Sequence, residues 1–292
     1  MQAPLMMPLT ELRIEAEALV RQLPRLSLKN AQASATHMGS SGRRRAGPGE
    51  DFWEYRRHDA LDDVSRIDWR RSARGDTLFV RETELETART IYLYVDPAIG
   101  FDWSGTPDRM TKADRARLLF MAIAALLSQA GEDVGVLSAT RSTGFGPRAL
   151  ERVYQQLVTP KAHQFIAPKR AGLLIIASDF YQPMSEWEAK LAPIAEKSRK
   201  GLLLAISDPV EIEFPFAGRV QLTAPGERRK RTLGRAQIYA RDYKKAYEDN
   251  RRALDTLAHQ LGWQVIPHST GEPSLDCASR LHHHLQNLVA RR

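Results

Sequence analysis

Two aspartates occupy positions from which their side chains could act together. Asp96 directly follows a short apolar run at 91–95, and Asp179 comes shortly after a second run at 173–176. Short apolar runs of this kind are typical of strands buried on both faces of a parallel sheet. Parallel strands end at the same edge, so we expect the two carboxylates to lie close together. Carboxylate oxygens are ligands for a hard cation such as magnesium.

The residues around the first aspartate do not complete such a site. The string at 96–100 reads Asp-Pro-Ala-Ile-Gly and contains no hydroxyl group. A richer string, Asp-Trp-Ser-Gly-Thr at 102–106, begins six residues later and is displaced from the strand end. Two carboxylates without hydroxyl ligands form a poor octahedral cage. The sequence therefore predicts a degenerate, empty metal site and no cofactor, with magnesium as the less favoured alternative.

Other chemistry-bearing patterns are absent from the sequence. It contains no Gly-x-x-x-x-Gly-Lys-Ser/Thr loop, no His-Glu-x-x-His and no Gly-x-Ser-x-Gly. The three consecutive histidines at 282–284 point in different directions on a helix, which predicts a solvated face and not a metal site. The single cysteine, Cys277, is expected to pack between helices. The chain is therefore predicted not to be an enzyme.

Alternation of strands and helices predicts the fold of the longer part of the chain. Short apolar runs are separated by helical stretches, a pattern that builds a doubly wound, mostly parallel α/β sheet with helices on both faces. Such sheets bind ligands at the carboxyl ends of their strands, where the strand order reverses. The expected strands are 91–95, 134–137, 173–176, 202–206 and 263–266, and the expected helices are 111–130, 148–157, 184–198, 238–260 and 274–289.

The residues before this α/β domain differ in character. Thr10 is the expected N-cap of an amphipathic helix that Pro24 ends. A linking segment rich in Ser, Ala and Gly follows, and then short runs at 52–55 and 78–80 that suggest a small β-rich annex. The predicted division is an N-terminal helix and linker at 1–37, the annex at 38–89 and the α/β domain at 90–292.

Positive charge is concentrated in one stretch of the chain. The net charge is +8, and residues 219–252 alone carry eleven Lys or Arg against four Asp or Glu. Such a patch attracts acidic partners, lipid headgroups or nucleic acid, although a solvated hairpin tip explains it as well. The core of the patch is Arg228, Arg229, Lys230 and Arg231.

Three tyrosines in the same stretch bear on the nucleic-acid alternative. Tyr239, Tyr243 and Tyr247 recur every four residues and therefore share one face of a helix. Their rings could stack on bases, or the face could simply pack against the protein.

No apolar run reaches the length of a membrane span, the longest being 118–127, and the N-terminus lacks the pattern of a signal peptide. We therefore expect a cytoplasmic protein.

The most specific string lies at 42–81 and contains Arg-Ile-Asp-Trp at 66–69. It resembles the signature of the domain-of-unknown-function family fifty-eight, which precedes a von Willebrand factor A-like (Rossmann-like) domain. This sequence departs from the signature at His58, where tyrosine is usual, and at Leu61, where glycine is usual. The matching positions are Arg56, Asp62, Arg66, Ile67, Asp68, Trp69, Ala73 and Arg74.

The resemblance implies a function as well as a fold. Members of the family are commonly encoded beside MoxR-type AAA+ ATPases and other von Willebrand factor A proteins, which implies a non-catalytic adaptor of such an ATPase. The complete metal site of these domains needs Asp-x-Ser-x-Ser, whose two hydroxyls are missing after Asp96. The arginines and acids of the signature form either a buried ion-pair network or a recognition surface.

Two other functions stay open at this stage. One is nucleic-acid binding through the basic stretch 219–252, with affinity that falls steeply with salt. The other is a metal-dependent hydrolase in which Asp96 and Asp179 recruit Asp102 or Asp208. The adaptor function is favoured over both.

Overall fold

The computed structural model describes residues 7–26, 52–57, 68–73, 75, 77–83, 90–138, 142–166, 172–196, 200–223 and 230–290. The chain forms two compact units. The larger unit combines the first 31 residues with residues 89–292, and the smaller unit comprises residues 32–88. The smaller unit is thus inserted, in sequence, between the first helix and the rest of the larger unit.

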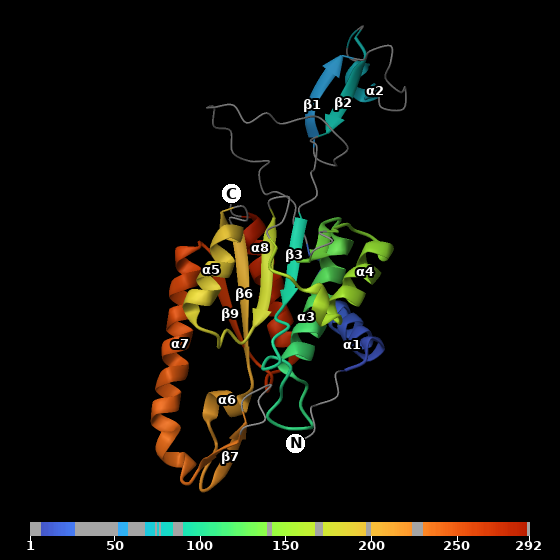
Figure 1. Ribbon diagram of the computed structural model, residues 1–292. Helices are drawn as coiled ribbons and strands as arrows, with labels where there is room; N and C mark the ends of the chain where they lie inside the picture. The colour runs from blue at the N-terminus through green and yellow to red at the C-terminus, as the bar shows by residue number, and fades with distance from the viewer. Residues whose placement is uncertain are drawn as a thin grey trace. The chain divides into compact units, whose positions relative to one another are not determined.

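A five-stranded sheet forms the centre of the larger unit (Figure 1). All neighbouring strands are parallel, and their order is β4-β3-β5-β6-β9. The order reverses between β3 and β5, which makes the carboxyl ends of these two strands the switch point of the sheet. The mostly parallel α/β fold predicted from the sequence is confirmed. The strands are β3 (Thr90–Val95), β4 (Asp133–Val136), β5 (Leu173–Ser178), β6 (Lys200–Ser207) and β9 (Gln264–Ser269).

Helices cover both faces of this sheet because strand residues alternate between two apolar clusters. In β3, for example, Leu93 belongs to one cluster and Tyr94 to the other. Figure 1 shows α5 and α7 on one side and α3 and α4 on the other. The helices of the first cluster are α1 (Leu9–Gln22), α3 (Lys112–Gln129), α4 (Pro147–Leu157) and α8 (Ser274–Ala290), and those of the second are α5 (Met184–Ala195) and α7 (Ala240–Gln260).

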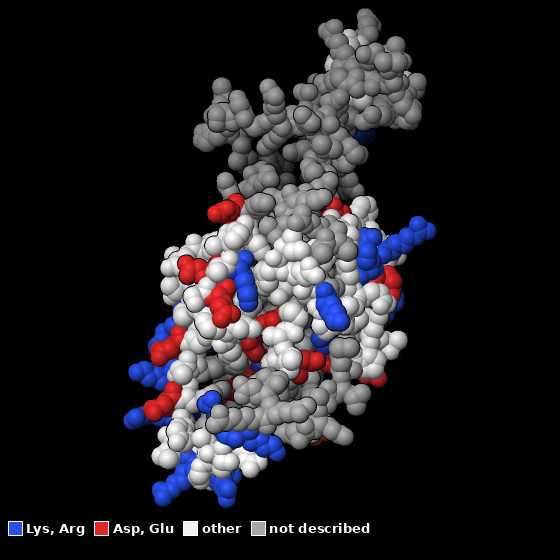
Figure 2. Space-filling view, in the orientation of Figure 1, with Lys and Arg blue, Asp and Glu red and all other residues white. Residues whose placement is uncertain are grey.

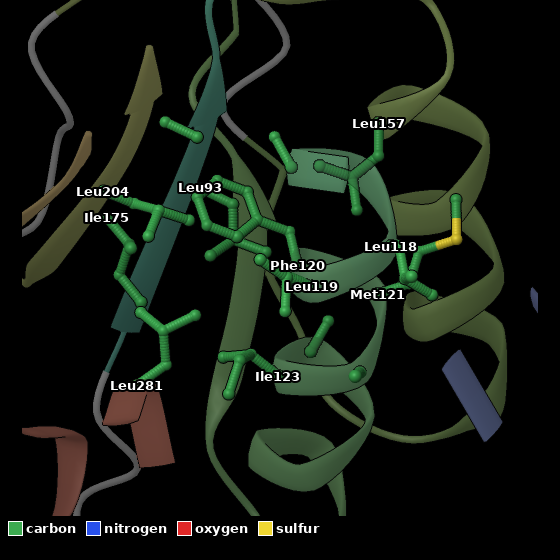
Figure 3. Packing of buried hydrophobic residues seen from close by; sticks show 14 of the residues in the cluster. Leu93, Leu118, Leu119, Phe120, Met121, Ile123, Leu157, Ile175, Leu204 and Leu281 are labelled. Atoms are coloured by element: carbon green, nitrogen blue, oxygen red, sulfur yellow. The ribbon is translucent and has the colours of Figure 1, made fainter. Parts of the chain in front are cut away.

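Helix α3 is the central element of the first cluster. Every residue from its start to Leu127 is buried, because the residues from Leu118 onward are apolar and the charged side chains of the first turns are paired, as Arg117 is with Asp114. Figure 3 shows Phe120 and Leu119 directed toward the strand residues Leu93 and Leu204. This packing fixes the start of α3, at Lys112, beside the carboxyl edge of the sheet.

The N-terminal helix belongs to the larger unit and begins earlier than the sequence predicts. Helix α1 starts at Leu9 after Pro8, so the prediction of Thr10 as the N-cap is wrong. The carbonyl of Pro8 accepts hydrogen bonds from the backbone N–H groups of Glu11 and Leu12, which places the helix start before the threonine. The buried residues Leu12, Ala16 and Leu19 face the first cluster.

The smaller unit contains an antiparallel pair of strands, β1 (Phe52–Arg57) and β2 (Phe79–Thr83), and the short helix α2 (Trp69–Ser72). Asp68 connects the helix to the strand, since its N–H donates to the Phe79 carbonyl at 2.8 Å. The hydroxyl of Ser72 donates back to the Asp68 carbonyl at 2.8 Å. The two strands themselves coincide with the runs at 52–55 and 78–80 expected for the annex.

Beyond the carboxyl end of β6 the chain forms a separate small structure (Figure 1). The short helix α6 (Pro209–Glu213) leads to a hairpin of β7 (Val220–Thr223) and β8 (Lys230–Leu233). The 3₁₀ helix η3 (Ala236–Tyr239) then leads into α7, and another, η2 (Pro160–Ala162), follows α4.

The histidines and the cysteine of α8 are distributed differently from the prediction. His282 is only 4% exposed, and its Nε2 lies 3.0 Å from the Pro24 carbonyl, so a solvated face for all three histidines is wrong. The reason is that α1 and α8 pack side by side on α3. Cys277 is buried in helix packing, as predicted, and burial raises the pKa of its thiol to about 12.

In the described part of the chain, no helix combines the length and apolarity that crossing a bilayer requires.

Candidate site at the switch point of the sheet

Asp96 and Asp179 follow the adjacent strands β3 and β5, so the expected juxtaposition at the sheet edge is present. Asp96 is buried, and its Oδ2 accepts a hydrogen bond from the Ser178 hydroxyl at 2.6 Å. Its other oxygen, Oδ1, accepts from the backbone N–H of Ala98 at 2.9 Å. The Asp96 carboxylate is therefore satisfied by the loops on either side of it.

A lysine ammonium lies beside the second aspartate. Lys112, the first residue of α3, donates from Nζ to Asp179 Oδ2 at 2.8 Å and to Glu211 Oε1 at 2.6 Å. The lysine is 0% exposed, and its Nζ lies 5.1 Å from the ring centroid of Tyr181 and 5.6 Å from that of Trp103. The ammonium group of Lys112 is thus a buried positive charge at the carboxyl edge of the sheet.

Glu211 is the partner that sequence reasoning did not identify. It lies in α6, 99 residues from Lys112, and its Oε2 accepts from the backbone N–H of Asp208 in a capping box. Burial raises the pKa of Glu211, although the charge of Lys112 lowers it in part. The ammonium therefore joins the loop after β5 to the helix after β6.

These residues do not fit a magnesium ion. Both oxygens of Asp96 are used, and the two oxygens of Asp179 accept from Lys112 and from the Tyr181 backbone N–H. An ammonium group bound to a carboxylate excludes a second cation from the same oxygens by charge repulsion. Within the described residues, no three His, Cys, Asp or Glu side chains are grouped as metal ligands.

Asp208, considered above as a recruit for hydrolysis, is held in a structural role. Its carboxylate accepts hydrogen bonds from the Arg109 guanidinium, the Thr270 hydroxyl and the backbone N–H groups of Val210 and Gly105. Burial alone would raise the pKa of Asp208, but these four hydrogen bonds outweigh it and lower the pKa. A carboxylate engaged in this way has no free oxygen for a metal or a water nucleophile.

The side chains of the string at 102–106, which does contain hydroxyl groups, also form hydrogen bonds within the protein. Asp102 accepts from the hydroxyl of Thr111, the N-cap of α3, at 3.0 Å. The Ser104 hydroxyl donates to the Thr106 carbonyl at 2.8 Å. The loop at 102–106 therefore supports the start of α3, and through it the position of Lys112.

The contact of this loop with Asp208 leaves no room for a side chain at Gly105. A Cβ atom there would lie 2.6 Å from Asp208 Oδ1 and 2.6 Å from Val210 Cγ2. We expect Gly105→Ala to lower the free energy of unfolding by about 1–3 kcal/mol, because overpacking displaces the carboxylate from its donors. Denaturant titration measures this loss. Gly234→Ala, where nothing lies within 4 Å of the added Cβ, is the control, and an equal effect of both substitutions would contradict the prediction.

The residues of the signature and of the basic patch are only partly described. Trp69 is 59% exposed, and Asp68 makes the backbone contacts given above. In the basic patch, Lys230 and Arg231 are exposed on β8. The structure describes only the backbone of Arg56, within β1. Residues outside the described part of the chain are Asp62, Arg66, Arg74, Arg228 and Arg229.

Two of the three tyrosines of the basic stretch pack inside the larger unit. Tyr243 stacks on Phe214 with ring centroids 4.6 Å apart. The Tyr247 hydroxyl lies 3.1 Å from the hydroxyl of Ser207. Tyr239 alone is exposed. The shared face thus packs in large part against the protein.

Comparison with known proteins gives the family. The model described as "Protein of unknown function DUF58" matches residues 54–253. This chain belongs to that family. The DUF58 match begins in β1 and ends in α7, and it includes both halves of the switch point, Asp96 and Asp179.

Relatives of this DUF58 chain occur in mycobacteria. It is 29% identical over 196 residues to an uncharacterized protein of Mycobacterium bovis and, with the same identity, to uncharacterized proteins of two strains of Mycobacterium tuberculosis. Each match spans 60% of this chain and 61% of the relative's length. No solved structure matches the chain at a significant level.

Lys112 is the residue of this DUF58 site that the sequence signals most weakly. A lysine at the first position of a helix is ordinarily solvated, and only the apolar character of residues 118–127 indicates that this helix is enclosed. A charge at the start of a buried helix that faces two acidic strand ends is the signal that could have identified it.

Proposed function

We propose that this DUF58 protein is a non-catalytic, cytoplasmic protein-interaction module with a von Willebrand factor A-like domain, and that its partner is a MoxR-type AAA+ ATPase. One observation carries the proposal: the Lys112 ammonium binds Asp179 where a domain of this type would hold a divalent ion. The Lys112 ammonium neutralises the acidic edge. Unlike a metal ion, it offers no open coordination position to a side chain of the partner. Binding at this edge then depends on the side chains around it and needs no bridging metal, and other von Willebrand factor A proteins are the second class of candidate partner.

Two apolar side chains at this edge are available to a partner. Ile99, in the loop after β3, is 70% exposed, and Tyr181, in the loop after β5, is 39% exposed. They follow the two adjacent strands of the switch point, the position at which doubly wound sheets bind their ligands. Exposed apolar residues beside a closed polar network favour a protein partner over a small substrate.

A binding experiment with a purified MoxR-type ATPase tests this function. We expect the full chain to retain the ATPase in the presence of EDTA, and Ile99→Asp to abolish most of the retention, because it places a charge in the interface. Phe145→Asp is the matched control, since Phe145 is 63% exposed in the loop before α4, where Gly146 donates to Ser128 at the opposite end of α3. ATPase turnover is measured in parallel. No retention and unchanged turnover would overturn the proposal, and retention lost only with EDTA would overturn its metal independence.

A further inference from the structure

The hairpin of β7 and β8 is an isolated two-stranded sheet. Val220 pairs with Leu233 and Thr223 with Lys230, so the two strands satisfy each other along one side only. Within the described residues, neither strand has a backbone hydrogen bond to any other part of the protein. Two-stranded sheets are marginally stable alone, and their outer edges present unpaired N–H and C=O groups to a further strand.

Exposed cations gather around this hairpin. Figure 2 shows Lys and Arg side chains around the lower tip of the molecule, where Figure 1 places β7. The described cations of this region are exposed, and no described residue forms an ion pair with them. They are Arg219, Lys230, Arg231, Arg235, Lys244 and Lys245.

One face of the hairpin adds an apolar contact. Leu222 is exposed and lies opposite Arg231 in the register, next to the pair of Val220 and Leu233 on the same face. Gln221 and the remaining residues form a polar second face. An added strand that alternates apolar and acidic residues would place its apolar side chains on the face of Val220, Leu222 and Leu233 and its carboxylates on the polar face that carries Lys230.

We propose that β8 accepts an acidic, extended segment of a partner protein as a third strand of the hairpin. Backbone hydrogen bonds to the free edge would supply affinity, and carboxylates on the polar face, beside Lys230, would supply selectivity, with the Arg231 cation of the opposite face adding to the attraction. The inference rests on the proposed function as an interaction module, but it does not require the partner to be an ATPase. Nucleic acid fits less well, because the half-buried Tyr243 ring already stacks on Phe214 and the half-buried Tyr247 side chain lies against Ser207.

Fluorescence anisotropy with the full chain and a labelled peptide of alternating glutamate and valine tests this inference. We expect binding that weakens with salt, and a loss of affinity of about tenfold or more in the double variant Lys230→Glu, Arg231→Glu. The double variant Lys244→Glu, Lys245→Glu changes the net charge equally on α7 and is expected to bind nearly as well as the wild type. The same peptide with methylated central backbone nitrogens is expected not to bind.

Three results would overturn it. Equal binding of the methylated peptide would show that charge attraction accounts for the binding and that no strand is added. Equal losses in the two double variants would show that the cations act without regard to the hairpin. Tighter binding of a DNA duplex than of the peptide would assign the surface to nucleic acid. Retention of the ATPase by the Lys230→Glu, Arg231→Glu variant, measured separately, tells a failure of this inference from a failure of the proposed function.

Discussion

Replacement of Lys112 by methionine is expected to lower the free energy of unfolding by about 3–5 kcal/mol, the cost of leaving buried carboxylates without their counter-charge. Asp179 and Glu211 both lose a donor at less than 3 Å when the ammonium is removed. Water can replace the ammonium only in part, because Asp179 is buried and the Glu211 side chain is only 15% exposed. Denaturant titration at neutral pH measures the change.

Two further variants show whether the loss arises from charge. In the triple variant Lys112→Met, Asp179→Asn, Glu211→Gln, no buried charge is left unpaired, so we expect much of the stability to return. Lys245→Met removes an exposed lysine and is expected to change stability by less than about 0.5 kcal/mol. If the triple variant were less stable than Lys112→Met, the ion-pair explanation would be wrong.

Mild acid is expected to destabilise the protein strongly, because two histidines are buried in the neutral form. Burial lowers the pKa of His163 to about 4, and burial together with the charge of Arg115 lowers the pKa of His268 to about 4. The unfolded chain binds these protons from about pH 6.5 downward, so stability is complete above that value and falls as the pH approaches 4. Each histidine accounts for about 3 kcal/mol of the loss.

The hydrogen bonds explain why each ring stays neutral and how to test the effect. His163 Nδ1 accepts from the Val95 backbone N–H, and His268 Nε2 faces the Arg115 guanidinium, which can only donate. Unfolding free energies measured at pH 7 and pH 5 should differ less in His163→Gln and in His268→Gln than in the wild type. His259→Gln, at an exposed position on α7, should leave the difference unchanged. A wild-type protein equally stable at both pH values would contradict the assignment.

The strands and helices of the larger unit were predictable because a parallel sheet is buried on both faces. Its strands therefore read as short apolar runs separated by helical stretches. The same reasoning placed Asp96 and Asp179 at one edge. It did not predict Lys112 as the partner of Asp179, because the second partner of the lysine, Glu211, lies 99 residues away in a helix of five residues, too short to give a periodic signal. His282 was assigned to solvent because a sequence does not reveal that α1 covers that side of α8.

The insertion of the smaller unit after α1 has a consequence for chain connectivity. Residues 32–88 leave and re-enter one folded body, and closing such a long interval costs only slightly more entropy than closing a shorter one. Helix α1 is consequently separated from β3 along the backbone, although it packs on α3 through Leu12, Ala16 and Leu19. With the backbone cut inside the interval, the helix would become a complementing peptide, held to the body by its apolar face and by polar contacts such as the Arg13–Glu151 ion pair.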